Sequence, residues 1–241
     1  DYYKGFVLVS DEDINDFLDV YGMSPTDTNS LINIERTTTQ LDIDAFISSI
    51  IRSLTDGFPD TGWVSETTRR ICQSANTVTT ELVNTQPDNC LLLWLETEYT
   101  LFRRIENHCY QDIISNPFPS VDQFIHIANT ILNRRKSRAG KSLEHHLNAI
   151  FNAHHLQFSH PGRTEGEKQP EFLFPGNTEY HSTDFDSESL IFLGAKTTCK
   201  DRWRQILSEA ERIPVKHLFT LQQGISKNQL HEMYEESNVK L

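Results

Sequence analysis

The chain contains 241 residues, of which 37% are hydrophobic and 10% aromatic, as in globular proteins with a core of ordinary size. No apolar run approaches the roughly 18 residues of a membrane-spanning helix, so a membrane span is excluded. The formal net charge of −12 argues against a broadly cationic surface for nucleic acid. Because residues 134–141 carry five positive charges and no negative one, the charge distribution still permits a nucleic-acid partner.

The start of the chain and its cysteines indicate the cellular setting. The chain opens on Asp1 with no signal-like segment, so we expect an internal part of a longer, cytoplasmic protein. The four cysteines lie far apart and form no C-x-x-C pair, which indicates neither a zinc site nor a disulfide framework.

The first forty residues predict short elements and a linker. Residues 5–9 (GFVLV) are typical of a short strand, and the apolar positions after Ser10 predict a short helix. Residues 24–40 are rich in Thr, Asn, Asp and Ser and predict a linker.

Helices dominate the middle of the chain. Apolar side chains recur at helical spacing over residues 41–54, and the helical pattern continues to about residue 133. Its longest helix is predicted from about Cys90 to Ile114, and another helix is predicted after Gly140. The aromatic residues at helical spacing with apolar neighbours are expected in the core rather than in a stacking platform; they are Trp94, Tyr99 and Phe102.

Strands and helices alternate in the last part of the chain. Strands are predicted at 171–174, 190–196 and 216–221, with the opening of another at 239–241. Helices are predicted at about 198–213 and 226–236. This alternation predicts an α/β fold in which helices flank a sheet, with the helix-rich region in front.

Lys196 is the first candidate for chemistry. It ends a predicted apolar strand after two small residues, Gly194 and Ala195. A lysine held rigidly there can place its ammonium beside a metal-bound water or a scissile phosphate. The alternative is a solvent-facing strand end, since most lysines are exposed.

Three carboxylates, Glu144, Glu171 and Glu209, are candidate partners of that lysine. Divalent cations prefer oxygen ligands, and nucleases usually hold Mg²⁺ with two or three converging carboxylates. The alternative for each is a solvated surface charge. The two histidine pairs at 145–146 and 154–155 lack a third ligand at a sensible spacing, so a metal site there is rejected.

A polar triplet, Lys200, Asp201 and Arg202, opens the helix predicted after Lys196. Arginine and lysine can pair with guanine in the major groove, and aspartate can accept from the amino group of cytosine. The alternative is a capping box formed by Thr198 and Asp201.

The block LGAKTTCKDRWRQILSEAERI at residues 193–213 resembles the catalytic core of the EcoRII restriction endonuclease family. The resemblance continues in NRRKSRAGKSLEHHL at 133–147 and TEGEKQPEFLFP at 164–175. It includes EYH at 179–181 and KHLFTLQQGIS at 216–226, and so spans about residues 133–241. It implies a PD-(D/E)xK fold with a mixed sheet, a requirement for Mg²⁺, and action on double-stranded DNA as a homodimer.

The resemblance also implies roles for matched residues. Lys196 matches the catalytic lysine, Glu209 the displaced acidic metal ligand, and Glu171 the first metal-binding residue. Glu144 matches an additional helix carboxylate, and Tyr180 matches a tyrosine near the active site. The residues expected to contact DNA are the base-reading triplet Lys200, Asp201 and Arg202 and the basic residues Arg134, Arg135, Arg138 and Lys141.

The chain departs from the family at Glu171, where relatives have aspartate. The extra methylene displaces the carboxylate by roughly 1 Å, a shift that can weaken catalysis severely. Asp184 or Asp186 could then assist.

The expected organisation has three parts. Residues 1–40 resemble the tail of an amino-terminal effector domain plus a linker, 41–132 form a helical dimerisation and DNA-contact region, and 133–241 form the catalytic core. Relatives flip the central base pair out of the duplex, and we expect that pocket in the helical region near Trp63 or Arg69-Arg70.

The sequence thus predicts a Mg²⁺-dependent type II endonuclease that cuts a palindromic CC-x-GG site in double-stranded DNA. One alternative is a catalytically weak DNA-binding module with a nuclease fold. Another is an acidic helical protein-interaction domain, which strong salt-dependent binding to duplex DNA would exclude.

Overall fold

The computed structural model describes residues 38–55, 57–222 and 225–241, without the side chains of residues 38–41, 200, 201 and 236. The strand predicted at residues 5–9, the helix after Ser10 and most of the predicted linker lie outside the described residues. No helix in the described part of the chain is both long and apolar enough to cross a membrane.

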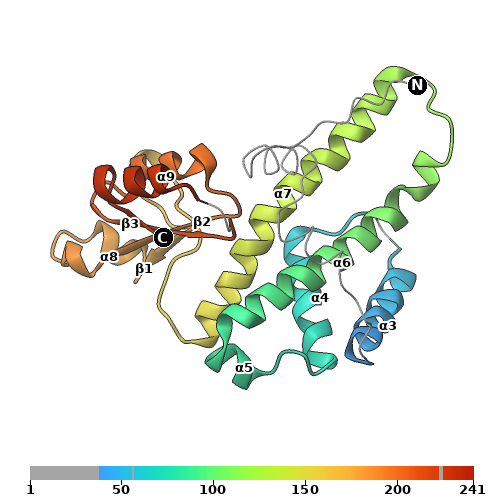
Figure 1. Ribbon diagram of the computed structural model, residues 1–241, viewed down its shortest axis with the longest axis horizontal. Helices are drawn as coiled ribbons and strands as arrows, with labels where there is room; N and C mark the ends of the chain where they lie inside the picture. The colour runs from blue at the N-terminus through green and yellow to red at the C-terminus, as the bar shows by residue number, and fades with distance from the viewer. Residues whose placement is uncertain (1–37, 56, 223–224) are drawn as a thin grey trace.

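Five helices come first and a small sheet with its own helices follows (Figure 1). The helices are α3 (Thr38–Ser53), α4 (Thr61–Ser74), α5 (Thr80–Thr85), α6 (Pro87–Ile114) and α7 (Val121–Ala153). The strands are β1 (Phe172–Phe174), β2 (Ile191–Lys196), β3 (Lys216–Thr220) and β4 (Val239–Lys240). The elements between and beside the strands are η1 (Glu165–Glu167), α8 (Asn177–His181), η2 (Ser187–Ser189), η3 (Lys200–Ser208), α9 (Lys227–His231) and η4 (Glu232–Glu236).

The helix starts follow local capping chemistry. Asp60 caps α4 by accepting from the Trp63 N–H at 2.9 Å, and Ser120 caps α7 by accepting from the Gln123 N–H at 3.2 Å. Pro87 stands in the first turn of α6, where its missing N–H is not needed. The helices predicted at 41–54 and about 90–114 are confirmed, since they correspond to α3 and α6.

Helix α7 corrects the prediction in two respects. It runs unbroken for 33 residues through Gly140, so it is longer than α6 with 28, and no new helix begins after Gly140. A glycine inside a helix costs about 1 kcal/mol, which the packing of α7 against α4, α6 and β2 outweighs. The expected boundary between residues 132 and 133 falls inside α7, and the domain division itself stays a prediction.

The sheet is mixed, with strand order β1-β2-β3-β4. Strand β1 is antiparallel to β2, whereas β2, β3 and β4 run parallel. Side chains alternate between the two faces along each strand. On β2, Leu193 and Ala195 face one core cluster and Phe192 faces the other.

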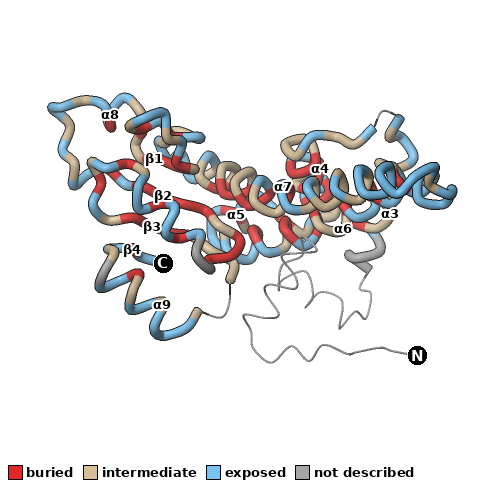
Figure 2. The backbone as a smooth tube through the Cα atoms, turned by 90° about the horizontal axis from the view of Figure 1, so that it is seen from above, coloured by how far each residue is buried: buried red, intermediate tan, exposed pale blue. Residues whose placement is uncertain are grey.

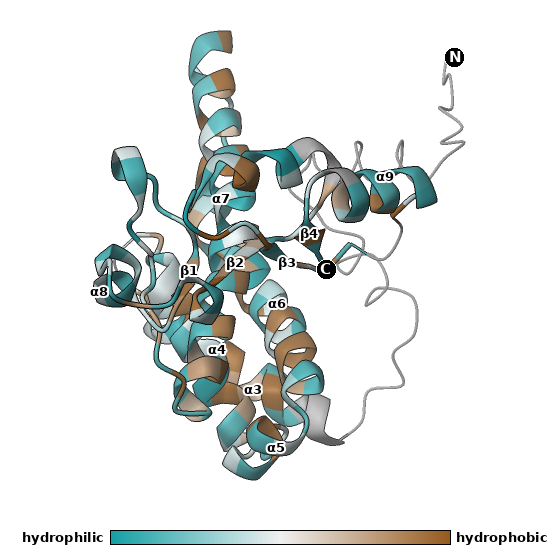
Figure 3. Ribbon diagram, turned by 90° about the vertical axis from the view of Figure 1, so that its left-hand side faces the viewer, coloured by the Kyte–Doolittle hydropathy of each residue, from teal (hydrophilic) through white to brown (hydrophobic). Residues whose placement is uncertain are grey.

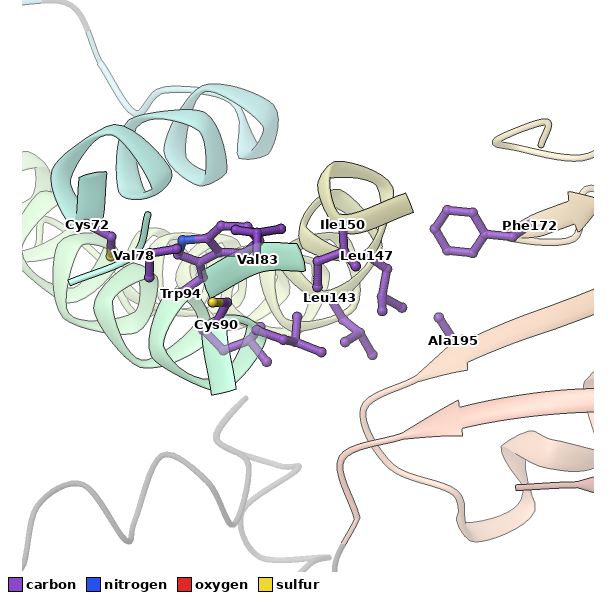
Figure 4. Packing of buried hydrophobic residues seen from close by; sticks show 12 residues of the cluster. Cys72, Val78, Val83, Cys90, Trp94, Leu143, Leu147, Ile150, Phe172 and Ala195 are labelled. Carbon is purple, nitrogen blue, oxygen red and sulfur yellow. The ribbon is translucent and has the colours of Figure 1, made fainter. Parts of the chain in front are cut away.

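One face of the sheet packs against α7. Figure 4 shows Phe172 and Ala195 of the strands across from Leu143, Leu147 and Ile150 of α7. The same cluster continues into the helical region through Trp94 and neighbouring residues of α4, α5 and α6. The sheet and the helices therefore share one hydrophobic core, which appears as the buried stretch through the middle of Figure 2.

The other face of the sheet is covered by short elements. Trp203 and Ile206 of η3, Tyr180 of α8 and Met233 of η4 pack against it. Gly194 allows η3 to approach closely, because a Cβ there would meet Ile206 Cγ2 at 3.1 Å. A third cluster joins α3, α4 and α6. The predicted α/β fold, with helices flanking a sheet behind a helix-rich region, is confirmed.

A buried contact between a histidine and a carboxylate lies between α6 and α7, and burial lowers the pKa of His146, which favours the neutral imidazole. His146 Nε2 lies 2.9 Å from Glu98 Oε2, both side chains are fully buried, and the His146 ring stacks on Trp94. Burial raises the pKa of the Glu98 carboxyl, but His146 and the hydroxyls of Ser65 and Ser142 together lower it below its usual value. The Glu98 carboxyl therefore favours its ionised form although it is buried between the helices.

We expect Glu98→Ala to destabilise the protein by about 1–3 kcal/mol, because it leaves the buried polar groups of His146, Ser65 and Ser142 without their acceptor. Urea unfolding at neutral pH measures this. The matched control is the double variant Glu98→Leu with His146→Leu, which should recover part of the loss, because Ser65 and Ser142 still lose their acceptor. A loss below about 1 kcal/mol for Glu98→Ala would show that the pair contributes little.

Candidate active site

Lys196 and Glu171 meet at one end of the sheet. The register pairs Phe172 with Leu193, so Glu171, just before β1, and Lys196, at the end of β2, lie diagonally across the two strands on the same face. The Lys196 ammonium donates to Glu171 Oε1 in an ion pair whose side chains are only 17% and 14% exposed. The solvent-facing alternative for Lys196 is therefore wrong.

Glu209 follows η3 directly and lies within electrostatic range of Glu171 and Lys196. Helix η3 ends at Ser208, and Glu209 follows in extended backbone with φ −94° and ψ 148°. Burial raises the pKa of the Glu209 carboxyl, and the negative charge of Glu171 acts in the same direction, while Lys196 opposes both. The three predicted residues thus share one electrostatic environment.

The helix predicted over residues 198–213 is wrong in type and extent. The structure has a 3-10 helix at Lys200–Ser208, followed by a turn in which Ala210 takes a positive φ of 51°. That turn sends Ala210 and Ile213 into the core on the η3 side of the sheet. The alternative capping box is not formed either, because η3 has no side-chain cap and Thr198 Oγ1 is buried without a hydrogen-bond partner in the described structure.

Glu144 reaches the site through His160. Glu144 Oε2 lies 2.9 Å from Lys141 Nζ and 3.9 Å from His160 Nε2. The other ring nitrogen of His160 lies 2.6 Å from the Glu171 carbonyl oxygen, and the ring stacks on Phe172 at 4.5 Å. Sequence reasoning missed His160, because only the bridge between Ser159 and Leu173 places it beside Glu171.

Tyr180 is buried, and its hydroxyl forms hydrogen bonds away from the Lys196–Glu171 pair. It bonds to Glu165 and accepts from the Arg212 N–H at 3.3 Å. Burial, together with the Glu165 carboxylate, raises the pKa of the phenol. Tyr180 therefore contacts the turn after Glu209 rather than the Lys196–Glu171 pair. Asp186, a suggested helper, instead caps η2 by accepting from the Glu188 N–H at 3.1 Å.

The expected basic surface on α7 is largely turned toward α6. Arg134 bonds to the Tyr110 hydroxyl and stacks on Phe58, and Arg135 pairs with both carboxylate oxygens of Glu106 at 2.6 and 2.8 Å. Arg138 is buried over Tyr99 and Phe102, while Lys136 and Lys141 are exposed. The predicted contact of these residues with DNA stays a prediction.

The triplet predicted to read bases lies at the start of η3. The side chains of Lys200 and Asp201 lie outside the described residues, and Arg202 is exposed. Arg202 is therefore the member of the triplet whose side chain the structure places in solvent.

The two carboxylates fit a divalent cation. Glu171 Oε2 and Glu209 Oε2 are both buried and lack a hydrogen-bond partner among the described residues, which is costly for a carboxylate. No cluster of three or more His, Cys, Asp or Glu side chains suited to a metal gathers in the described ranges. Mg²⁺ commonly takes one or two protein carboxylates and fills its other positions with water and phosphate, so this pair suits it.

Comparison with solved structures defines the class of fold. A PspGI restriction endonuclease–substrate DNA complex has a TM-score of 0.61 at 15% identity, over 74% of this chain and 74% of that chain. A metal-depleted Ecl18kI complex with uncleaved, modified DNA has a TM-score of 0.57 at 18% identity, over 85% of this chain and 74% of that chain. The chain therefore has the restriction-endonuclease-like fold.

Sequence comparison narrows this class to a family. Residues 102–241 match the family model described as EcoRII C terminal, and the chain belongs to that family. The type II restriction enzyme EcoRII of Escherichia coli is 53% identical over 156 residues. That match covers 64% of this chain and 38% of the enzyme, so the chain spans less than half the length of this relative.

Proposed function

We propose that this chain carries the catalytic site of a Mg²⁺-dependent type II restriction endonuclease that cuts double-stranded DNA. The observation that carries the proposal is the meeting of Lys196, Glu171 and Glu209 at one end of the sheet, with two buried carboxylate oxygens left unpartnered. Membership of the EcoRII C-terminal family and the DNA complexes among the structural neighbours support it.

Each residue of the site has a separate proposed role in phosphodiester hydrolysis. A bound Mg²⁺ would supply Lewis-acid activation of the phosphate and of water. Glu171 and Glu209 would hold it through the carboxylate oxygens that lack partners in the protein. Lys196, fixed by Glu171, places a positive charge where negative charge develops on the phosphate. His160 contacts the main-chain carbonyl of Glu171, and Glu144 lies near the other ring nitrogen of His160.

The proposed substrate is a palindromic CC-x-GG site, either CCWGG or CCNGG. The relative in Escherichia coli supports a site-specific enzyme, and the triplet at the start of η3 has the donors and acceptor that read a G·C pair. A cavity of about 590 Å³ beside the start of α4 is the proposed pocket for a flipped base. Phe58, Thr61 and Val64 line it together with Arg134 and Arg138, whereas Trp63, Arg69 and Arg70, near which the pocket was predicted, are not among its lining residues.

A two-fold symmetric site is matched best by a homodimer, which places one active site on each strand. The amino-terminal half of α7 projects from the rest of the molecule (Figure 3), and the end of α6 and the start of α7 expose an apolar surface. The exposed residues there are Ile113, Ile114, Val121, Phe124 and Ile125. We propose this surface as the dimer contact, and sedimentation equilibrium would report the mass.

The test of the function is incubation of the chain with plasmid DNA and Mg²⁺, followed by sequencing of the ends. Discrete ends at CC-x-GG sites that disappear with a chelator support the endonuclease. Salt-dependent duplex binding with no cleavage at any Mg²⁺ concentration would favour the catalytically weak DNA-binding module. Absence of both binding and cleavage would contradict the proposal.

A further inference from the structure

We propose that Lys216 is a positioning residue, which holds the turn of residues 208–213 so that the Glu209 carboxylate faces Glu171. The inference rests on the proposed function of Glu209 as a metal ligand. It assigns a role to a buried ammonium that takes no part in the chemistry described above.

The turn after η3 needs external support. Glu209 is the first residue beyond the helix, and Ala210 has a φ of 51°, a conformation that non-glycine residues rarely adopt. One backbone hydrogen bond closes the turn, from the Ile213 N–H to the Ala210 carbonyl at 2.9 Å. Because Glu209 is joined directly to Ala210, anchoring the Ala210 carbonyl limits the backbone positions open to Glu209 and so restricts where its side chain can lie.

Lys216 supplies that support from β3. Its ammonium donates to the carbonyl oxygens of Ala210 at 2.5 Å and of Ile213 at 2.6 Å. The residue is only 4% exposed, and the ammonium lies over the Phe192 ring at 5.3 Å. The strand register pairs Lys216 with Phe192 on β2 and with Val239 on β4, so the first residue of β3 is held by strands on both sides.

The burial of this charge is unusual. Lysine is rarely fully buried unless it is paired, and the hydrogen-bond acceptors that the described structure gives Lys216 are main-chain carbonyls. Burial lowers the pKa of Lys216 to about 8, although the carboxylates of Glu165, Glu209 and Glu211 act against it. The positive charge of Lys216 in turn favours the ionised form of Glu209, the form that binds a cation.

Other side chains hold the same turn from the opposite side. The Glu165 carboxylate accepts from the Glu211 N–H at 3.2 Å, and the Tyr180 hydroxyl accepts from the Arg212 N–H at 3.3 Å. Lys168 donates to the Ser208 carbonyl. Side chains thus contact the main chain of the turn at Ser208, Ala210, Glu211, Arg212 and Ile213. Lys216 provides the contacts at Ala210 and Ile213.

The test is Lys216→Met, which keeps the length of the side chain and removes its charge and its donors. We expect the dissociation constant for Mn²⁺, measured by electron paramagnetic resonance, to rise about ten-fold or more, as for other residues that orient metal ligands. The Mg²⁺ concentration for half-maximal cleavage should rise in parallel, while metal-free DNA binding stays within two-fold. The melting temperature should fall modestly, because the Ala210 and Ile213 carbonyls lose a buried donor, so Mn²⁺ affinity is compared well below the melting temperature of both proteins.

Two further variants distinguish a loosened turn from the loss of a positive charge. Tyr180→Phe loosens the turn from its other side without changing a buried charge, and it should weaken Mn²⁺ binding in the same direction. Lys240→Met is the matched control, because Lys240 is exposed on the neighbouring strand β4, and it should bind Mn²⁺ like the unaltered chain.

The outcomes separate the two proposals. Unaltered Mn²⁺ affinity in folded Lys216→Met, beside a normal unaltered chain, overturns the positioning role alone. A lower melting temperature with unchanged metal affinity shows a purely structural lysine and also overturns it. If the unaltered chain itself binds no Mn²⁺ and cuts no DNA, the proposed function fails, and the inference fails with it.

Discussion

Lys196→Met should reduce cleavage of duplex DNA by at least about 10²–10³-fold, the usual cost of losing one group that stabilises transition-state charge. The ammonium of Lys196 is held by Glu171 at the end of β2, within electrostatic range of both carboxylates proposed to hold the metal. Single-turnover cleavage of a short duplex with excess protein measures the loss without interference from product release.

Duplex affinity separates this loss from a folding defect. Metal-free DNA binding by Lys196→Met should stay within a few-fold of the unaltered chain, because one phosphate contact among many is removed. Lys240→Met serves as the surface control for the loss of a positive charge. Cleavage by Lys196→Met at more than a tenth of the normal rate would contradict the role proposed for Lys196.

Glu209→Gln should abolish metal-dependent cleavage and at the same time raise the thermal stability of the metal-free protein. The folded-state pKa of Glu209 lies above its usual value near 4.5 because burial and Glu171 disfavour the charged form. Its stabilising contribution is therefore fully present below pH 4.5 and is lost as the pH rises through the folded pKa. Glutamine removes that loss at neutral pH.

Melting curves in the presence of a chelator measure this effect. At pH 7.5 the melting temperature of Glu209→Gln should exceed that of the unaltered chain by roughly 2–4 °C, the shift that a modest gain produces in a chain of this size. The difference should shrink as the pH falls below about 4.5, where Glu209 is protonated in both states. A variant that melts lower at pH 7.5 would contradict the electrostatic account.

Local sequence patterns predicted most of the strands and helices. The strand predicted at 190–196 corresponds to β2, and that at 171–174 corresponds to β1, because short apolar runs bounded by proline and glycine leave few alternatives. The errors arose where tertiary contacts override local signals. Gly140 did not end α7, because core contacts on both sides hold the helix, and the stripe after Thr198 became a 3-10 helix that fits over Gly194.

In the candidate site, too, some residues could be predicted from the sequence and others depend on tertiary contacts. Lys196 and the carboxylates Glu171 and Glu209 could be proposed from the resemblance, and the structure brings the three together. His160 and Lys216 could not be found, because their contacts are with main-chain carbonyls that only the folded sheet places nearby. The contacts of Arg134, Arg135 and Arg138 with aromatic and acidic side chains could not be predicted either, because those partners are distant in the sequence.

The continuity of α7 limits how relatives of this chain can exchange parts in evolution. A recombination point at residue 133 would join two halves of one helix and divide a cluster that runs from Trp94 to Phe172. A hybrid made there would have to match the register of the helix and the shapes of both halves of the core at once. The proposed specificity and catalytic elements between α4 and β4 are therefore expected to be inherited together.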